Sequence, residues 1–454
     1  MRSIYPKLSF LAFALGIFTT SFSQTNSPFS RYGIGNLSGP QHTISRGMGG
    51  LQAVYADGLN NNVGLSVNFN NPATYSQFYM MTYDLALNLD SRNLKSNQPA
   101  GTFSSVYLIP GYVAIGTPLN VKKGLGLAFG LKPLSRVNYS VITRERTAGD
   151  SLGTNFNGSG GSYDAFVGVG KKWKNFSVGV NTGYRFGRKE TATLKSFLND
   201  TLSYQQSNSS TATSFGNFFF QGGLQYELSL YKKDNSFTKS TDQYWLRFGA
   251  TATLQQNLNA TRDIVRQTYA LSAIGNQTEI DSVFKITDEK GTIVIPATYE
   301  GGIMLHKTIS NSRGLFEIWS FGLEYSTTQW TKYRYYGQPD ALRNSWMLRL
   351  GGQFSPNPQT GTNYLSSVNY RFGVNIGQDY IDADGNGLRT RSISFGAGLP
   401  IRRWRSYETQ YTVVQMAFQY GKRGSSVNNI TENFLQVNFG VSLNDKWFIK
   451  RRYD

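Results

Sequence analysis

Residues 435 to 443 read Leu-Gln-Val-Asn-Phe-Gly-Val-Ser-Leu, and every second side chain in this stretch is apolar. Successive side chains of a β-strand point to opposite faces, so this two-residue period predicts a strand with one apolar and one polar face. The preceding stretch alternates in the same way, with Met416, Phe418 and Tyr420 on one face. The end of the chain is therefore predicted to form neighbouring antiparallel strands.

The same alternation recurs along nearly the whole chain of 454 residues, of which 14% are aromatic. Beyond the N-terminus there is no run of the about 18 apolar residues that a spanning helix needs. Trp447 and Phe448 follow the last strand directly, where an interfacial aromatic girdle is expected. These features predict an all-β fold, a transmembrane antiparallel β-barrel that closes on its C-terminal strand.

Strands can be counted from the alternation. The predicted strands are 82–92, 104–117, 124–146, 162–170, 176–186, 215–230, 244–256, 298–306, 316–329, 344–355, 365–376, 390–400, 411–421 and 434–444. A barrel of about fourteen strands, an even number, places both chain ends on the periplasmic side. The connections on that side are then mostly short, and the two longest connections, 187–214 and 257–297, lie outside, as outer-membrane barrels require.

The third predicted strand contains an interruption. Apolar residues alternate from Leu125 to Leu131, Pro133 follows, and alternation resumes at Val137. Proline has no amide hydrogen for the ladder and is normally excluded from strand interiors. If Pro133 were a turn, the strand count would become odd, so we interpret this stretch as one long strand kinked at Pro133.

The N-terminus has a different texture. Residues 1–23 have the basic, apolar and small-residue regions of a cleaved signal peptide, which predicts export. Residues 24–80 are rich in Gly and Asn, too short to build a core of their own, yet contain many apolar side chains. We predict that they fold as a plug, or hatch, inside a barrel that comprises residues 81–454 and ends in a periplasmic tail. An exported transmembrane β-barrel is expected in the outer membrane of a Gram-negative cell.

Composition excludes several classes of function. There is no cysteine, which excludes disulfides and thiolate chemistry, and only two histidines, His42 and His306, so we expect no transition-metal site and no cofactor. No catalytic constellation is recognisable, and we expect no enzyme. The net charge of +18 is scattered among strands and turns rather than gathered on a helix. The Lys and Arg side chains are therefore expected to contact lipid headgroups, or simply water in the turns and lumen, rather than nucleic acid.

One motif resembles a metal loop. Asp382, Asp384 and Asn386 stand at alternate positions, with Gly387 at the sixth, as in the first half of a calcium-binding loop. Ile393 occupies the position of the bidentate Glu. A tight outer turn is the interpretation we favour, with a weak calcium site as its alternative.

Together these features resemble the long-chain fatty-acid transporter (FadL-like) family of outer-membrane proteins, in the form associated with the Bacteroidota. Residues 46–50 read Arg-Gly-Met-Gly-Gly, Ala56-Asp57 follows, and Asn71, Pro72 and Ala73 match the Asn-Pro-Ala motif that ends the family's hatch. A kinked third strand is also a family trait. The hatch is longer here and the segment 187–214 is rich in Ser, Thr and Asn, so individual ligand contacts cannot be matched.

The resemblance implies passage of hydrophobic small molecules by lateral diffusion into the bilayer. Pro133 would hold a gap in the wall, and Asn71, Pro72 and Ala73 would gate the pocket when the hatch moves. The alternative is a structural or adaptor subunit of an envelope secretion or assembly complex, with other envelope proteins as partners. A water-filled porin ranks third, because a plug would obstruct a barrel of this size.

Overall fold

The computed structural model describes residues 27–39, 42–57, 65–98, 100–147, 150–197, 205–236, 239–271, 277–312, 314–356, 363–383, 385–401 and 411–445. The predicted signal peptide, the C-terminal tail after residue 445 and Asp384 lie outside these residues. None of the helices in the described part of the chain is long and apolar enough to cross a membrane.

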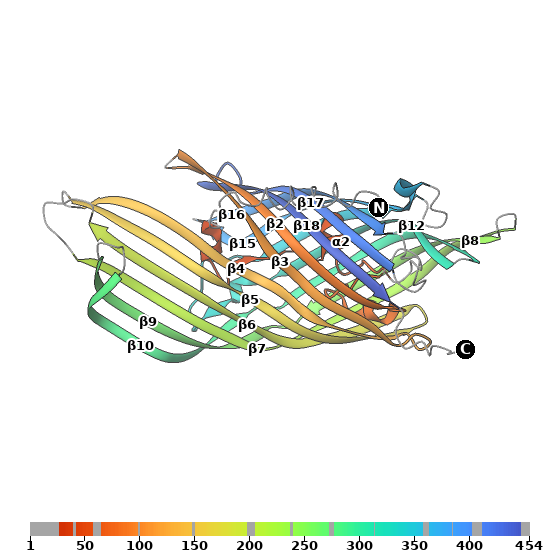
Figure 1. The fold of residues 1–454 in the computed structure, drawn as a ribbon, viewed down its shortest axis with the longest axis horizontal. Coiled ribbons are helices and arrows are strands. Elements are labelled where there is room, and N and C mark those ends of the chain that lie inside the picture. The colour runs from red at the N-terminus through yellow and green to blue at the C-terminus, as the bar shows by residue number, and fades with distance from the viewer. Residues whose placement is uncertain are drawn as a thin grey trace, which may run out of the picture.

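Fourteen strands form a closed antiparallel barrel, which confirms the predicted fold class (Figure 1). The barrel strands are β2 (Met81–Asn97), β3 (Ala100–Asn120), β4 (Leu125–Thr147), β5 (Asp150–Trp173), β6 (Phe176–Phe197), β7 (Gln206–Asn235), β8 (Ser240–Thr253), β11 (Thr298–Asn311), β12 (Gly314–Thr328), β14 (Ser345–Phe354), β15 (Asn369–Ala383), β16 (Asn386–Ile401), β17 (Tyr411–Arg423) and β18 (Ile430–Asp445). Closure follows from the antiparallel pairing of β18 with β2, from Ile430 opposite Ser96 to Asp445 opposite Met81.

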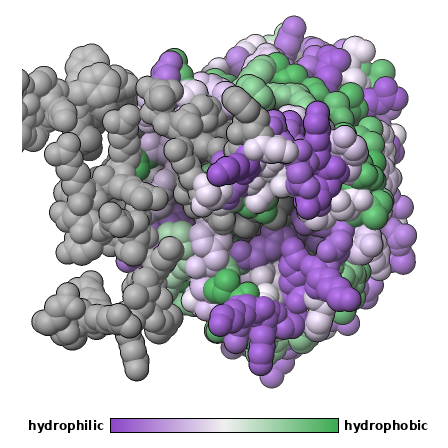
Figure 2. All heavy atoms as spheres, turned by 90° about the vertical axis from the view of Figure 1, so that its right-hand side faces the viewer, coloured by the Kyte–Doolittle hydropathy of each residue, from purple (hydrophilic) through white to green (hydrophobic). Residues whose placement is uncertain are grey.

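The last strand shows which face of the barrel meets lipid. Leu435 and Phe439 are 44% and 42% exposed, whereas the intervening Asn438 and Ser442 are 0% and 1% exposed. The apolar side chains therefore point outward and the polar ones inward, which is the orientation of a barrel in a bilayer. Figure 2 shows the end of the barrel where β18 terminates: hydrophilic side chains gather over this end, and hydrophobic ones lie along the flank. The chain is a multi-pass β-barrel of the outer membrane.

The two stretches expected as long outer loops are largely strand. β6 and β7 extend over most of 187–214, and β9 (Gln256–Leu271) and β10 (Gln277–Ile295) form a hairpin. The N-terminal part of β7, residues 206–216, pairs with β9, and its C-terminal part, residues 221–235, pairs with β8. The sheet therefore continues above the barrel on one side, where β9 and β10 lie in Figure 1.

The described residues from Ser27 to Met80 are largely buried and pack against glycines and inward-facing side chains of the barrel strands, and we call them the plug. Its elements are the 3-10 helix η2 (Pro28–Arg31), strand β1 (Asn36–Leu37), helix α2 (Thr43–Gly47) and the 3-10 helix η3 (Pro72–Gln77). Two more 3-10 helices, η4 (Trp330–Lys332) and η5 (Tyr364–Ser367), and the short strand β13 (Arg334–Tyr335) lie between barrel strands. Asn71 starts η3 because its side chain accepts a hydrogen bond from the Ala73 amide and Pro72 occupies the first helical position.

Candidate functional site

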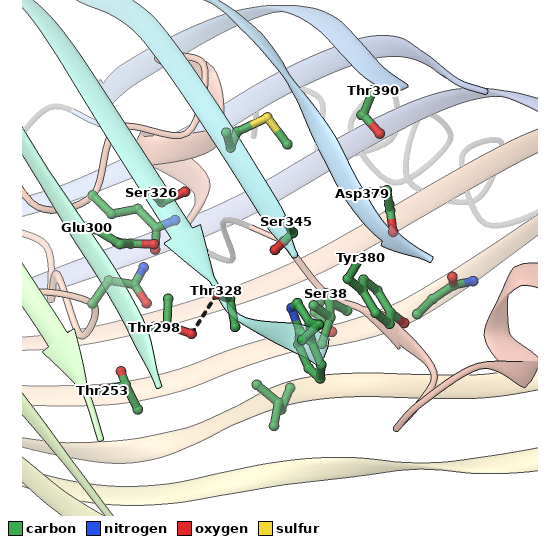
Figure 3. Close-up of a pocket in the computed structure, with 18 of the residues that line it drawn as sticks. Ser38, Thr253, Thr298, Glu300, Ser326, Thr328, Ser345, Asp379, Tyr380 and Thr390 are labelled. Atoms are coloured by element: carbon green, nitrogen blue, oxygen red, sulfur yellow. Dashed lines mark hydrogen bonds between the residues drawn. The ribbon is translucent and has the colours of Figure 1, made fainter. Parts of the chain in front are cut away.

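A cavity of about 380 Å³ lies in the outer half of the lumen, between segments of the plug and the barrel wall (Figure 3). One side carries a row of hydroxyl groups contributed by successive strands. The row consists of Thr253 of β8, Thr298 of β11, Ser326 and Thr328 of β12, Ser345 of β14 and Thr390 of β16. Two of these hydroxyls, those of Thr298 and Thr328, share a hydrogen bond of 2.9 Å. This side of the cavity can therefore hydrogen-bond a polar group of a ligand.

Charged side chains in the floor of the cavity are mostly paired with one another. Arg185 donates two hydrogen bonds to Asp164, at 2.7 and 2.9 Å. Arg349 lies 2.9 Å from Glu324 and 3.7 Å from Glu300. Such pairing satisfies charges that would be costly to bury alone.

Lys132 is the exception in this floor. Its ammonium lies 5.2 Å from the ring centre of Phe69 and 6.0 Å from that of Phe166, and the side chain is 8% exposed. Among the described residues, no ion pair within 4.0 Å includes Lys132; its close contacts are with the two rings, and the negative charge of Asp164 acts on it from a greater distance. An anionic group entering the cavity would find this cation without a bound carboxylate.

The outer side of the cavity is apolar. The tilted rings of Trp330 and Tyr380 are in contact with centres 4.7 Å apart, and Ile295, Leu134 and the plug residue Ile34 lie beside them. These residues belong to, or pack against, one buried apolar cluster formed by the outer segments and the N-terminal end of the plug. The cavity is therefore amphipathic, with an apolar roof and a polar floor.

The plug is held against the wall by glycines. In eleven barrel strands, one described inward-facing glycine lies so close to the plug that an added Cβ would meet a plug atom at 3.0 Å or less. These glycines, which we call the glycine belt, are Gly116, Gly126, Gly170, Gly179, Gly223, Gly249, Gly322, Gly351, Gly373, Gly396 and Gly440. At most of these positions the nearest plug atoms belong to backbone, which cannot move aside as a flexible side chain could.

Side chains of the wall also bind the plug backbone. Glu324 accepts hydrogen bonds from the amides of Gln52 and Ala53 at 2.9 and 2.7 Å. Asp84, fully buried, accepts one from the amide of Val67 at 3.0 Å. Because the plug has little regular secondary structure, its backbone groups need these partners. Backbone packing and hydrogen bonding together fix the plug in place.

The Asn-Pro-Ala motif lies at the centre of this contact. Besides capping η3, Asn71 donates hydrogen bonds to the carbonyl oxygens of Ala53 at 2.6 Å and Leu224 at 3.4 Å. Asn71 and Ala73 are completely buried, and Pro72 lies against Gly170 and Gly179. The motif joins two parts of the plug to the wall, and its role as a gate stays a prediction.

Pro133 lies in β4 at a local break in the sheet. The ladder between β3 and β4 runs only from Asn120 opposite Leu125 to Val113 opposite Leu131. Beyond Pro133, β4 pairs with β5 on one edge and, on the other, with β1 of the plug, where Leu37 lies opposite Ser135. The side of the barrel between β3 and β4 is thus lined by a plug strand instead of by a continuous ladder.

A second cavity, of about 50 Å³, lies behind this break, between Tyr107 of β3, Pro133 of β4 and the plug. It shares Leu37 and Ser38 with the larger cavity. The short plug segment around β1 therefore separates the two cavities. Arg136 lies 4.9 Å from the ring centre of Tyr107 and bridges the break by a cation–π contact.

Arg46, from the plug motif 46–50, ties the plug to the last two strands. It donates hydrogen bonds to Gln419 at 3.2 Å, to Gln436 and to the Ser38 carbonyl oxygen at 3.1 Å. Burial lowers the pKa of Arg46 to about 10, and the negative charge of Asp90 opposes this effect. Arg46 therefore stays protonated at neutral pH.

The remaining motif residues have structural partners. Asp382 lies 3.3 Å from Arg343, and Gly385 has a φ of +77°, as a tight hairpin turn requires. A cation at Asp382 would have to compete with this guanidinium. His42 lies 3.0 Å from Asp84 and stacks on Tyr112 with ring centres 5.3 Å apart, which is a structural role. His306 is buried near Glu317, at 3.5 Å.

Reasoning from the sequence missed the glycine belt, Lys132 and the plug strand β1. The belt left a signal, since many predicted strands carry a glycine at a position whose neighbours at i±2 are polar. No feature of the sequence distinguishes Lys132 from the other basic residues. Lys132 has no ion pair because the nearby Asp164 pairs with Arg185, and only the folded structure brings these residues together.

The fold is shared with solved structures of transporters and channels. The toluene transporter TbuX of Ralstonia pickettii matches with a TM-score of 0.53 and 13% identity, covering 90% of this chain and 99% of its own. The CymD monoaromatic hydrocarbon channel matches with a TM-score of 0.51 and 14% identity, over 90% and 99%. A FadL homologue of Pseudomonas aeruginosa matches with a TM-score of 0.50 and 13% identity, over 90% and 98%. None of these three is named as an enzyme.

No curated protein matches the chain by sequence. The model of one protein family, BamG, matches residues 6–454. Because this match extends over nearly the whole sequence, the chain belongs to the BamG family.

Proposed function

We propose that this barrel passes hydrophobic small molecules from the outer face of the membrane through the break between β3 and β4. The observation that carries the proposal is the ladder between these strands, which ends at Val113 and Leu131 in front of a lumenal cavity. The glycine belt favours this route over an axial one, since backbone packing closes the lumen below the cavity. Solved barrels of the same fold named as a toluene transporter and a monoaromatic hydrocarbon channel support it.

The cavity suits an amphipathic molecule. Burying an apolar tail against Trp330, Tyr380 and Ile295 is worth about 25 cal/mol per Å². A carboxylate or phosphate head would pair with Lys132, which has no carboxylate of its own within ion-pair distance in the described part of the chain. Asn71, Pro72 and Ala73 would then hold the floor of the cavity, and Pro133 would keep the lateral route open by offering no amide to β3.

The test locks the plug strand. Leu37 and Ser135 lie directly opposite each other on β1 and β4, and the chain has no cysteine, so a Leu37→Cys/Ser135→Cys pair can be oxidised selectively. Oxidation is expected to block uptake of a fluorescent fatty acid and of toluene in a strain that depends on this protein, and reduction to restore it. The two single-cysteine variants, treated with the same oxidant, are the controls. Unchanged uptake in the oxidised double variant would exclude this route.

Further parts of the proposal concern the cell. We infer export by the signal peptide of residues 1–23, a Gram-negative host of the Bacteroidota, and outer-membrane lipids as the immediate surroundings of the barrel. The turn at Asp382, Asp384 and Asn386 is proposed as structural.

A second candidate is a non-transporting structural or adaptor subunit of an envelope secretion or assembly complex. The observation in its favour is the density of contacts between plug and wall, together with buried ion pairs of the wall such as Arg185 with Asp164 and Arg349 with Glu324. The test is gentle purification through a C-terminal tag, followed by mass spectrometry. Stoichiometric envelope proteins with an empty barrel would support the adaptor, and a bound apolar molecule without them would support passage.

A further inference from the structure

A recess of about 840 Å³ lies on the outer surface of the barrel, above the break between β3 and β4. Its lining comes from the end of β3 and from the neighbouring strands β4, β5, β6 and β7. The lining residues that the argument uses are Phe103, Asn138, Ser140, Asn157, Ser159 and Ser210. In Figure 1, β3 and β4 diverge towards their outer ends.

The pairing register shows that the recess faces outward. Asn157 lies opposite Ser140 and Ala192, and Ala192 lies opposite Ser210, so these four side chains form one row across the sheet. Asn157 is an even number of residues from Tyr163, which is 43% exposed on the lipid side, and so points the same way. The inward-facing Ser162 and Asp164 have the opposite parity and are buried.

An aromatic group lies directly below the recess. Tyr163, Tyr184, Phe186 and Phe218 are exposed and in contact, with ring centres of Tyr163 and Phe186 6.1 Å apart and those of Tyr184 and Phe218 5.4 Å apart. Exposed aromatic side chains of this kind mark the boundary of the hydrocarbon region. Ser159 lies four residues above Tyr163, about 13 Å along the strand at about 3.3 Å per residue. The recess is therefore at the level of the outer-leaflet headgroups.

The chemistry of the lining is that of a sugar site. Amide and hydroxyl side chains predominate, and the charged lining residue Glu190 lies 2.6 Å from Arg188, which neutralises it. No Lys or Arg is among the described lining residues, so the recess offers nothing to bind phosphate strongly. Phe103 of β3 also lines the recess and is 64% exposed, although it lies on the face of β3 that carries the buried Ser105 and Tyr107. Hydrogen-bonding groups beside an exposed ring complement the hydroxyls and the C–H face of a pyranose.

We propose that this recess binds the saccharide portion of an outer-leaflet glycolipid such as lipopolysaccharide. A lipid-borne saccharide is favoured over a free one because the recess faces sideways, on the same surface as the lipid-contacting aromatic side chains and just above them. The glycolipid would hold its sugars against β4 to β7 beside the break and its acyl chains against the aromatic residues below. This inference does not depend on whether the barrel passes small molecules.

The experiment is native mass spectrometry of the full-length protein, released from nanodiscs that contain rough-type lipopolysaccharide or, separately, lipid A without core sugars. We expect the wild type to retain the lipopolysaccharide about tenfold more tightly than lipid A, a preference worth about 1.4 kcal/mol. Ser210→Phe, which fills the recess, should abolish this preference. Ser214→Phe is the matched control, because Ser214 lies on the same face of β7 but outside the recess.

A gel-shift assay of unheated protein checks that each variant is folded. If Ser210→Phe does not fold, Asn157→Ala is used in its place, because it shortens a side chain instead of enlarging one. Asn157→Ala should lower the preference for lipopolysaccharide over lipid A severalfold. Equal retention of lipid A and lipopolysaccharide by the wild type would overturn the proposal. So would a folded Ser210→Phe, or a folded Asn157→Ala, that binds as the wild type does.

Discussion

The two halves of this barrel are closed in different ways. In the inner half, glycines from eleven strands let the plug backbone lie directly on the wall, and buried side chains such as Glu324 and Asp84 bind its amides. In the outer half, the ladder between β3 and β4 ends at Leu131, and plug residues from Ser27 to Ser38, including the two-residue strand β1, bind the edge of β4 beyond it. The inner half can change only by disrupting close packing, whereas the outer half can change by exchanging a few hydrogen bonds.

The strongest test of this contrast is a side chain added to the glycine belt. At Gly223 a Cβ would overlap the side chain of Asn71, whereas at the neighbouring Gly222 nothing lies within 4 Å. Overpacking usually costs about 1–3 kcal/mol, and more where the obstructing group is held in place, so Gly223→Val should greatly reduce the yield of folded barrel. Gly222→Val should fold normally. The mobility of unheated protein on gels measures both, and equal behaviour would mean that the plug can withdraw from the wall.

The next effect concerns buried charge. Arg247 is fully buried, lies 2.7 Å from Glu227 and donates to the Val54 carbonyl oxygen of the plug at 3.3 Å. Arg247→Met leaves the buried Glu227 with only the more distant Lys172, 3.9 Å away, among its cationic partners in the described residues, and should destabilise the barrel by about 3–5 kcal/mol. Arg188→Met breaks an exposed pair and should cost no more than about 1 kcal/mol. Thermal unfolding in detergent compares the two, and similar losses would argue against a fixed inner half.

A smaller loss is expected at the Asn-Pro-Ala motif. Asn71→Ala removes two hydrogen bonds to carbonyl oxygens and the cap of η3, which should cost about 1–3 kcal/mol. Asn363 caps η5 by the same bond, to the Leu365 amide at 3.2 Å, but at an exposed site. Asn363→Ala should therefore cost about 0.5 kcal/mol. If both variants unfold at the same temperature, Asn71 does not anchor the plug and its role as a moving gate gains support.

A substitution at Pro133, where the ladder between β3 and β4 is interrupted, is expected to change stability least. It should nevertheless strongly reduce the uptake of hydrophobic molecules. Pro133→Val supplies an amide that can pair with β3, and the stability should change by no more than about 1 kcal/mol, as for most substitutions outside tightly packed sites. Uptake of hydrophobic probes should fall. Pro400→Val, in β16 where Pro400 already lies opposite Val413, is the control and should leave uptake unchanged. A folded Pro133→Val barrel with undiminished uptake of every probe would refute the lateral route.

Alternation located the barrel strands well because lipid and lumen impose opposite demands on successive residues. The predicted 411–421 and 434–444, for example, correspond to β17 (Tyr411–Arg423) and β18 (Ile430–Asp445). Alternation failed above the membrane, in 187–214 and 257–297, where water lies on both faces of the sheet and polar residues suit both. There β6, β7 and the β9–β10 hairpin continue as strands in which apolar and polar residues do not alternate regularly over the whole strand.

For the candidate site, the sequence predicted less. It singled out Pro133 as a break, because proline lacks the amide that a ladder needs, and it suggested a plug from apolar residues that had no core of their own. It could not indicate that β1 pairs with β4, because these strands are about a hundred residues apart in the sequence. Nor could it indicate that Lys132 lies over Phe69, about sixty residues away.

The sequence by itself thus determined the class of fold, the number and direction of the strands and the place of the interruption at Pro133, because these follow from local periodicity and from the missing amide of proline. Only the tertiary structure decided which glycines receive the plug, which charges are left unpaired and what surrounds the outer recess. These properties arise where strands distant in sequence come to the same height and face of the barrel, and strand register, which no single stretch encodes, sets that height.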